Sequence, residues 1–242
     1  MKERIQKLLS NAGVMSRRQA EKIIQDGKVL INGMKASLGD KIDPAVDSLK
    51  VNGKKINFNV KRKFMILNKP PGYICTHADP EGRPTIFDLF KSRVYLSYVG
   101  RLDFNSEGLV ILTNDGEMKK FLSLPENGIE REYKVKVRGL VDEDSIRELS
   151  KKRRIDRRNV KPVSVRVLQK NKNSSWISIV LTEGVNREIR KICEASGHLV
   201  SRLIRVRFGP LTLKGLKKGD SRELIYDEIK KLDKLKEKRI KN

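Results

Sequence analysis

The run Leu109–Leu112, four consecutive branched apolar residues, constrains the fold of this 242-residue sequence more than any other stretch. A short apolar run that ends at a turn, here Asn114-Asp115-Gly116, is typical of a fully buried strand. The loop before it, Gly100-Arg101-Leu102-Asp103, places the carboxylate of Asp103 between Gly100 and Gly108. Such an aspartate either bonds nearby backbone N–H groups in a turn or serves as a lone nucleophile or acid/base on an anionic substrate held by cations.

The net charge of the chain limits the kinds of molecule that it can be expected to bind. It carries 54 Lys+Arg against 30 Asp+Glu, a formal net charge of +24, which indicates a polyanion such as nucleic acid or an acidic membrane face. The sequence argues against a membrane, because no apolar run approaches the roughly 18 residues needed to span one. Met1 leads directly into a charged amphipathic helix, so no signal peptide is expected. Cys75 and Cys193 lack metal-ligand spacing and are interpreted as reduced thiols of a cytoplasmic protein.

The first 58 residues have the pattern of a small basic domain, with 12 Lys/Arg and 6 Asp/Glu. Apolar residues at helical spacing predict a helix over residues 3–12, and Ser16 is the expected N-cap of a second helix over 17–26. Short strands are expected at 29–31 and 49–51, each followed by an Asn-Gly turn. Polar and basic residues 59–63 are interpreted as a linker, which gives one small and one medium domain.

The second part of the chain alternates between strand and helix patterns. Residues 132–138 alternate strictly, so Tyr133, Val135 and Val137 are expected on the inward face of a strand. Further strands are predicted at 64–67, 176–181 and 200–208, and short helices near 87–90, 117–124, 142–150 and 187–196. In the last of these helices the buried stripe of Ile189, Ile192 and Cys193 places Arg187, Arg190 and Glu194 together on another face.

Three basic segments complete the pattern. In 200–208 the alternation predicts a packed face of Ile204, Val206 and Phe208 and a cationic face with Arg205. Residues 151–170 hold 9 Lys/Arg and one Asp and are interpreted as a solvated loop that adds RNA affinity through counterion release. The tail, 228–242, has 7 Lys/Arg and 3 Asp/Glu and is expected to be a frayed helix or disordered.

The central loop also carries a resemblance. Gly100-Arg101-Leu102-Asp103, followed by Ser106-Glu107-Gly108-Leu109 and Leu112-Thr113-Asn114-Asp115-Gly116, resembles the signature loop of the pseudouridine synthases, and within them the branch that modifies bacterial ribosomal RNA at single uridines. Asp79-Pro80-Glu81-Gly82-Arg83-Pro84-Thr85 favours the members that act on large-subunit ribosomal RNA. The resemblance covers nearly the whole chain to about residue 227.

The resemblance implies a fold and a division of labour. The expected fold is α+β, with a catalytic domain over 64–227 that has a mixed, mostly antiparallel sheet and a basic cleft. Residues 1–58 resemble the αL RNA-binding module first known from a small-subunit ribosomal protein, through Ser16-Arg17-Arg18-Gln19-Ala20-Glu21 and Gly27–Gly33. By that resemblance Ser16, Arg17, Arg18 and Lys28 would lie on its RNA face, where cations suit shape recognition of folded RNA.

Family chemistry also implies roles for single residues. Asp103 would act on the glycosidic bond, as nucleophile or as acid/base. Tyr133 would stack on the target base, or else be an ordinary core tyrosine. Arg190 would pair with Asp103 and keep it ionised, and Arg101 would fill the space that the flipped base leaves. Leu203 or Ile204 would form an apolar wall beneath that base.

The remaining expectations concern RNA contacts and partners. Lys69, in the rigid turn after strand 64–67, is well placed to meet a phosphate, and Arg83, Arg187 and Arg205 are further candidate RNA contacts. His77 and His198 have no partner pattern and are expected to be structural. The resemblance implies isomerisation of uridine to pseudouridine in ribosomal RNA by a monomer that uses no metal, nucleotide or redox cofactor. Two alternatives remain: a synthase for small-subunit ribosomal RNA, and a non-catalytic RNA-binding assembly factor.

Overall fold

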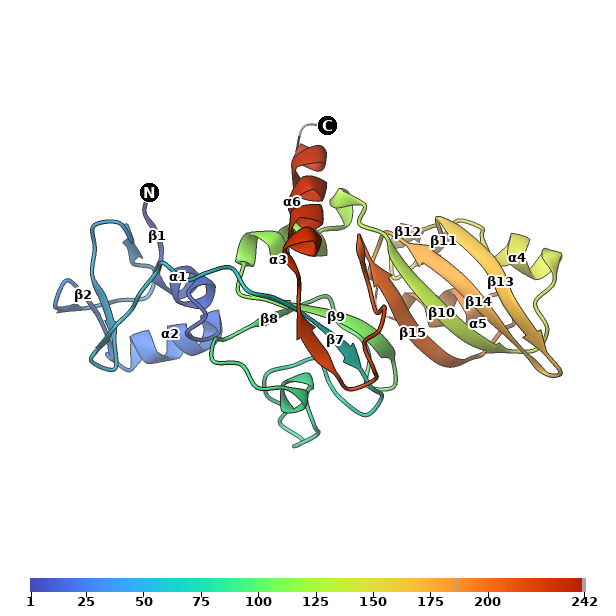
Figure 1. Cartoon of the computed structure of the whole chain (residues 1–242), viewed down its shortest axis with the longest axis horizontal. Coiled ribbons are helices and arrows are strands. Elements are labelled where there is room, and N and C mark those ends of the chain that lie inside the picture. Colours follow the sequence, from blue (N-terminus) through green and yellow to red (C-terminus); the bar gives the residue numbers. More distant parts are fainter. Residues whose placement is uncertain (186, 241–242) are drawn as a thin grey trace. The chain divides into compact units, whose positions relative to one another are not determined.

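The computed structural model describes residues 1–185 and 187–240, which form two compact units (Figure 1). The first unit comprises Met1–Phe64 together with Ser92–Ser97 and Leu112–Lys119. The second comprises Met65–Lys91, Tyr98–Ile111 and the chain from Lys120 onward. Every helix in the described ranges is too short or too polar to span a lipid bilayer.

The first unit packs two helices against a small sheet. Its strands β2, β3, β5 and β6 form a four-stranded antiparallel sheet in the order β3-β2-β5-β6, and β1 pairs with β4. The bounds are β1 Glu3–Arg4, α1 Ile5–Asn11, α2 Arg17–Gln25, β2 Val29–Ile31, β3 Met34–Lys35, β4 Lys41–Ile42, β5 Leu49–Val51 and β6 Lys54–Lys55.

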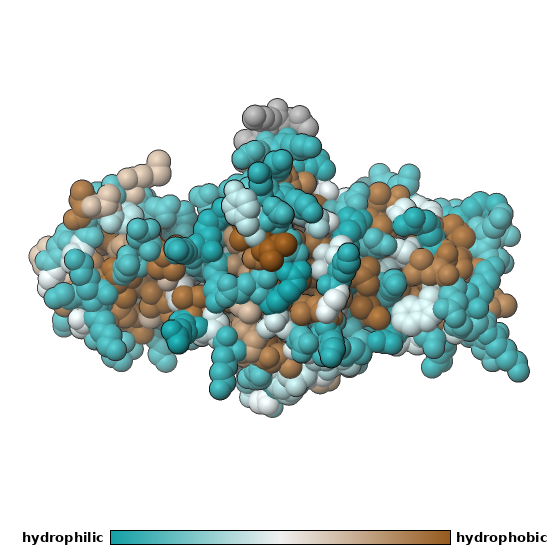
Figure 2. Space-filling model, viewed as in Figure 1, coloured by the Kyte–Doolittle hydropathy of each residue, from teal (hydrophilic) through white to brown (hydrophobic). Residues whose placement is uncertain are grey.

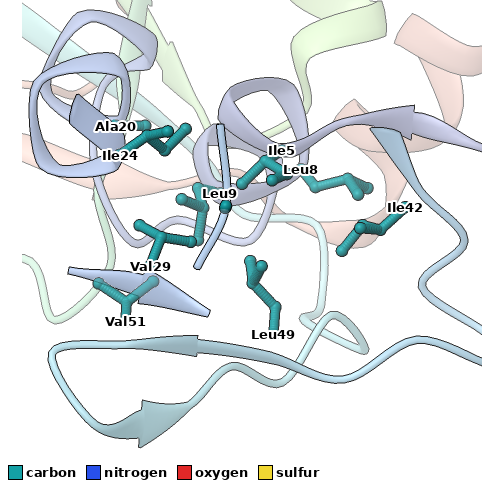
Figure 3. Packing of buried hydrophobic residues seen from close by; sticks show 10 residues of the cluster. Ile5, Leu8, Leu9, Ala20, Ile24, Val29, Ile42, Leu49 and Val51 are labelled. Atoms are coloured by element: carbon teal, nitrogen blue, oxygen red, sulfur yellow. The ribbon is translucent and has the colours of Figure 1, made fainter. Parts of the chain in front are cut away.

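Apolar side chains from the helices and the sheet meet in one core (Figure 3). Ile5 and Leu9 of α1 and Leu49 of β5 are fully buried there, together with Ala20 of α2 and Val29 of β2. The Ser16 hydroxyl begins α2 as predicted, because it accepts a hydrogen bond from the Gln19 N–H at 3.1 Å in a reciprocal capping box. The first helix is shorter than expected, since Glu3 and Arg4 pair with β4 instead.

The second unit is built on a nine-stranded sheet. Its central order is β13-β14-β10-β15-β9-β7-β17, with β16 paired to β15 and β8 to β9. The pairs β13–β14, β14–β10 and β10–β15 are antiparallel, whereas β15 and β9 are parallel, so the sheet is mixed and mostly antiparallel as expected. Its strands are β7 Phe64–Lys69, β8 Ser97–Val99, β9 Glu107–Thr113, β10 Arg131–Arg138, β13 Ser164–Asn171, β14 Ser174–Leu181, β15 Val200–Phe208, β16 Leu211–Thr212 and β17 Ser221–Glu223.

Helices flank this sheet at the predicted places. Asp142 caps α4 by accepting a hydrogen bond from the Ser145 N–H, and the 3-10 helix η1 begins at a reciprocal cap between Thr85 and Asp88. Buried β9 is apolar from Leu109 to Leu112, which confirms the central strand. The helical bounds are η1 Ile86–Leu89, α3 Gly116–Ser123, η2 Pro125–Asn127, α4 Glu143–Leu149, α5 Glu188–Glu194 and α6 Tyr226–Ile240.

The prediction of a solvated loop over 151–170 is wrong. Strands β11 Arg153–Ile155 and β12 Arg158–Val160 form a tight hairpin whose two turn residues, Asp156 and Arg157, have positive φ, and β13 follows. Ile155 and Val160 are buried, and the Arg153 guanidinium donates to the Ile192 carbonyl at 3.0 Å. Two apolar anchors and one partly buried arginine therefore order a segment that its charge alone marked as mobile.

Up to Ile240 the predicted tail is a helix rather than disordered, and residues 241 and 242 lie outside the described residues. α6 begins at Tyr226, ahead of the predicted boundary at 228, and Leu232 on its inner face is fully buried. Arg222 and Glu228 form a two-bonded ion pair at the start of the helix, with both N–O distances 2.7 Å. Apolar anchoring and this pair hold the helix against the rest of its unit.

Candidate active site

The loop that carries Asp103 is held from behind by Lys69. The Lys69 side chain, at the end of β7, is fully buried, and its ammonium donates to the backbone carbonyls of Asp103 at 3.1 Å, Phe104 at 3.2 Å and Ser106 at 2.7 Å. It also donates to the Pro70 carbonyl at 3.0 Å. Burial lowers the pKa of Lys69 to about 8. The expected phosphate contact of Lys69 is therefore wrong, because every acceptor that this ammonium reaches is loop backbone.

The Asp103 side chain itself is exposed. Its backbone carbonyl closes a turn by accepting from the Ser106 N–H at 3.0 Å, whereas its carboxylate has no hydrogen bond or ion pair with the described residues. The first interpretation of Asp103, a turn carboxylate that accepts hydrogen bonds from nearby backbone N–H groups, does not match this geometry. Behind the loop, β9 and β15 approach so closely at Gly108 that a Cβ there would lie 2.2 Å from the Arg205 carbonyl oxygen. The backbone of the loop is thus held in place, and the exposed carboxylate is available to a ligand.

A cavity of about 220 Å³ opens beside Asp103, and three strands supply its walls. Its lining combines loop, strand and helix-start residues: Gly100, Arg101, Leu102, Asp103, Ser106, Ser123, Arg131, Tyr133, Leu181, Gly184, Val185, Arg187, Glu188, Ile189, Leu203 and Arg205. The cations Arg101, Arg131, Arg187 and Arg205 outnumber the carboxylates in this list. The cavity therefore suits a negatively charged or strongly polar ligand.

Two further predicted residues lie on this cavity. Tyr133 is 9% exposed and sits in β10 directly across from Arg205 of β15, and the inward alternation of Tyr133, Val135 and Val137 is confirmed. Of the two candidates for an apolar wall, Leu203 lines the cavity and Ile204 is not among its lining residues. A planar ring and an apolar side chain on the walls can hold a nucleobase between them.

Arg205 lies inside the protein, not on a cationic outer face. It is 2% exposed, its Nε donates to the Leu109 carbonyl at 2.7 Å, and its guanidinium lies over the Phe208 ring at 5.2 Å. The predicted alternation failed because β10 and β15 shift register between Glu132 and Tyr133 and again between Lys136 and Val137. Leu203, Arg205 and Phe208 are consequently the buried members of β15, so Arg205 lines the cavity and does not lie on the predicted cationic outer face.

Two buried charged residues of the cavity were missed from the sequence. Arg131 donates to the Thr182 carbonyl at 2.8 Å and the Leu122 carbonyl at 3.0 Å, so it braces the strand ends around the cavity. Glu188, 4% exposed, accepts from the Val185 N–H at 2.9 Å, and burial raises its pKa to about 7. Arg131 starts the alternating strand, and Glu188 is next to Ile189 of the predicted helical stripe. These positions are the only sequence signal that could have identified the two residues as part of the cavity.

Arg190 does not pair with Asp103. Its guanidinium donates to the Val200 carbonyl at 3.2 Å, and it lines a separate hollow together with Arg187 and Glu194. The predicted common face of these three side chains is confirmed, and that face turns Arg190 away from the Asp103 cavity. Arg187, exposed and in a left-handed conformation with φ of 52°, lines both hollows. Arg187 is therefore the α5-side cation that reaches the Asp103 cavity.

The expected RNA contacts outside the cavity are mostly accessible. Arg17 and Arg18 are exposed in the first turn of α2, where the helix dipole disfavours cations, so a nearby polyanion would relieve them. Lys28 is half exposed and lies 3.5 Å from Asp26. The Arg83 guanidinium is bound by Asp79 at 2.9 and 3.0 Å, which offsets part of its charge.

The two histidines and Cys193 are not among the cavity-lining residues, whereas Cys75 lies against the Asp103 loop, where its Sγ accepts a hydrogen bond from the Leu102 N–H at 3.4 Å. His198 contacts the Arg138 carbonyl and the Ser145 hydroxyl, and His77 stacks on Phe87. Cys75 and Cys193 are both buried thiols. Within residues 1–185 and 187–240, no cluster of three or more His, Cys, Asp or Glu is arranged to hold a metal ion.

Comparison with known proteins gives consistent matches over the whole chain. The family model described as RNA pseudouridylate synthase matches residues 63–195, and the S4 domain model matches residues 3–46. An uncharacterized RNA pseudouridine synthase of Rickettsia typhi is 40% identical over 230 residues, 95% of this chain and 94% of that protein. The ribosomal large subunit pseudouridine synthase B of Bacillus subtilis is 39% identical over 236 residues, 95% of each protein. A crystal structure of a pseudouridylate synthase superposes with a TM-score of 0.67 at 27% identity, over 95% of this chain and 99% of that one.

Proposed function

We propose, because this chain belongs to the RNA pseudouridylate synthase family, that it converts a uridine of large-subunit ribosomal RNA to pseudouridine with Asp103 as its catalytic carboxylate. The family match and the curated relatives support the reaction. The name of the Bacillus subtilis relative, at 39% identity, supports the choice of ribosomal subunit. The observation that carries the proposal is an unpaired, exposed carboxylate on a clamped loop at the mouth of a cationic cavity.

The reaction needs the target nucleotide out of its helical stack. Unstacking costs a few kcal/mol, which contacts to the RNA backbone repay. Once flipped, the uracil lies between the Tyr133 ring and Leu203, and Arg101 at the mouth of the cavity fills the space left behind. These contacts hold the glycosidic carbon next to Asp103.

Asp103 then acts on the glycosidic bond. That bond between ribose C1′ and uracil N1 breaks, the uracil turns while it stays in the cavity, and a new bond forms between C1′ and C5. C5 loses its hydrogen as a proton and N1 takes up a proton, so atoms and charge balance with no outside reactant. Arg187 and Arg205 line the same cavity as Asp103 and supply positive potential for an anionic substrate.

The two parts of the chain divide binding from chemistry in this proposal. Residues 1–58 dock on folded ribosomal RNA through Ser16, Arg17, Arg18 and Lys28, while residues 64–227 hold the cavity. Arg187 contacts RNA at the cavity, and Arg83 and Arg190 contact RNA outside it. The protein works as a monomer in the cytoplasm, where ribosomal RNA is available.

The subunit assignment is tested by incubating the purified protein with separate transcripts of large- and small-subunit ribosomal RNA. Pseudouridine is then mapped by chemical modification and reverse-transcription stops. We expect one modified position in the large-subunit transcript and none in the other. Modification confined to the small-subunit transcript would overturn the choice of subunit, and none in either would overturn the activity.

A further inference from the structure

The C-terminal helix borders a second hollow of about 410 Å³, far from the Asp103 loop in sequence and lined by different residues. Its walls come from the start of β10, from the turn between β15 and β16, and from α6. Its lining is Gly128, Ile129, Glu130, Arg207, Gly209, Pro210, Lys231, Lys234, Leu235, Lys238 and Arg239, here named the α6 groove. Helix α6 presents a largely hydrophilic surface in this region (Figure 2).

The floor of the α6 groove is rigid. A Cβ at Gly209 would lie 3.4 Å from a methyl of Ile129 and 3.5 Å from a methyl of Leu235, so the turn, the strand and the helix are in close contact. On the inner side, Leu232 is fully buried. The helix therefore presents its outer side chains from a fixed position.

The groove holds far more positive than negative charge. Arg207 and Glu130 pair across it at 2.9 Å, which consumes its one carboxylate. Lys231, Lys234 and Lys238 are exposed and make no hydrogen bond or ion pair within the described chain. They recur at i, i+3 and i+7 on one face of the helix and span about 10 Å along its axis. Unpaired like charges in a row repel each other unless a polyanion lies along them.

We propose that the α6 groove binds the phosphodiester backbone of the RNA substrate at a position separate from the catalytic cavity. This inference rests on the proposed function, which supplies RNA as the polyanion. The row of lysines follows a strand of phosphates, and the shallow apolar floor of Ile129, Pro210 and Leu235 accepts a sugar edge. Such contacts carry no base sequence information; they fix the orientation of the RNA.

The test compares two triple variants of equal charge. Lys231→Gln/Lys234→Gln/Lys238→Gln removes the row, and Gln keeps a high helix propensity. The control, Lys172→Gln/Lys214→Gln/Lys217→Gln, removes three exposed lysines elsewhere in the same unit. Binding of a large-subunit ribosomal RNA transcript is measured by filter retention between about 50 and 200 mM KCl, where phosphate contacts show as salt dependence.

The groove variant is expected to bind about tenfold more weakly at about 0.1 M salt, and its slope of log K against log [salt] is expected to shrink by about 2. The control should change affinity less than about threefold and the slope by less than about 0.5, because diffuse charge contributes little without contact. Pseudouridine formation at saturating protein should stay at the wild-type rate in both. Equal slopes for the two triple variants would overturn the inference, as would a groove variant that loses only its saturated rate.

A single variant guards against damage to the helix. Lys234→Gln alone should reduce the slope by about 0.7 to 0.9, with circular dichroism and melting temperature unchanged. If the groove variant differs from the wild-type protein by the predicted slope but the wild-type protein forms no pseudouridine, the proposed function is refuted and the groove proposal stands. If the wild-type protein forms pseudouridine but the groove variant has the same slope as the wild-type protein, only the groove proposal is refuted.

Discussion

Replacing Lys69 by Met tests whether the buried ammonium sets the position of Asp103. Met keeps the length and most of the volume of the side chain and removes the donors. Three carbonyls of the loop, those of Asp103, Phe104 and Ser106, lose a charged partner at 2.7 to 3.2 Å. A hydrogen bond to a charged group contributes about 1.5 to 3 kcal/mol, and carbonyls that become exposed bind water instead. The gross loss in the free energy of unfolding is therefore about 5 kcal/mol for the three bonds.

The loss is partly offset, because the ammonium is itself expensive to bury. Its pKa falls from 10.5 to about 8, which corresponds to about 3 kcal/mol against the charged form. The net cost of Lys69→Met to the free energy of unfolding should therefore be about 2 kcal/mol, a modest part of the total. The rate should respond more strongly, since a displacement of about 1 Å of a catalytic group costs about 100-fold.

Two measurements on one variant separate these effects. Urea unfolding gives the stability, and single-turnover tritium release from RNA labelled at uridine C5 gives the rate. Lys91→Met, which removes an exposed lysine from the same unit, is the matched control and should change neither. A Lys69→Met protein whose rate stays within about threefold of wild type would refute the role assigned to this ammonium, whatever its stability.

Two further predictions concern the cavity walls. The pKa of Glu188 is about 7 in the folded protein and 4.5 in the unfolded chain, so its contribution to stability is full below pH 4.5 and is lost as the pH rises through 7. Glu188→Gln should remove this pH-dependent loss. Relative to acid pH, its free energy of unfolding at alkaline pH should exceed that of the wild-type protein by about 3 kcal/mol. Urea titrations across that range check it, and parallel pH profiles for the two proteins would contradict it. Leu203→Ala should lower kcat/KM by about tenfold or more, because the Leu203 side chain lines the cavity. Ile204 is half exposed and is not among the cavity-lining residues, so Ile204→Ala should leave kcat/KM within about threefold of wild type. Equal effects of the two substitutions would show that the apolar wall is misassigned.

Local patterns predicted the parts of the molecule that obey local rules. The strict alternation of 131–138 survives as the burial pattern of β10, and the Ser16 and Asp142 caps begin their helices because each needs only a neighbour three residues away. The buried run of β9 and the loop before it were also evident, since an uninterrupted apolar run has few alternatives. Asp103 and Tyr133 come together as expected, from elements whose types were correct.

The errors arose where distant contacts decide. Lys69 follows a buried strand, and only the closed loop 34 residues later provides the carbonyls that turn it inward. In β15 two register shifts against β10 move Arg205 to the inside, and no pattern within β15 reveals a shift that depends on its partner. Arg190 was assigned by motif, and the helix face that carries it was correct; which cavity that face meets depends on how α5 packs.

The most direct test of the account is single-turnover tritium release by Asp103→Asn on large-subunit ribosomal RNA labelled at uridine C5. Asn keeps the shape of the side chain and leaves the Lys69 anchor intact, because that anchor uses the backbone carbonyl. The account predicts loss of release by at least about 10⁴-fold, with RNA affinity within about threefold of wild type. Release at a rate close to that of the wild-type protein, at equal RNA binding, would contradict it.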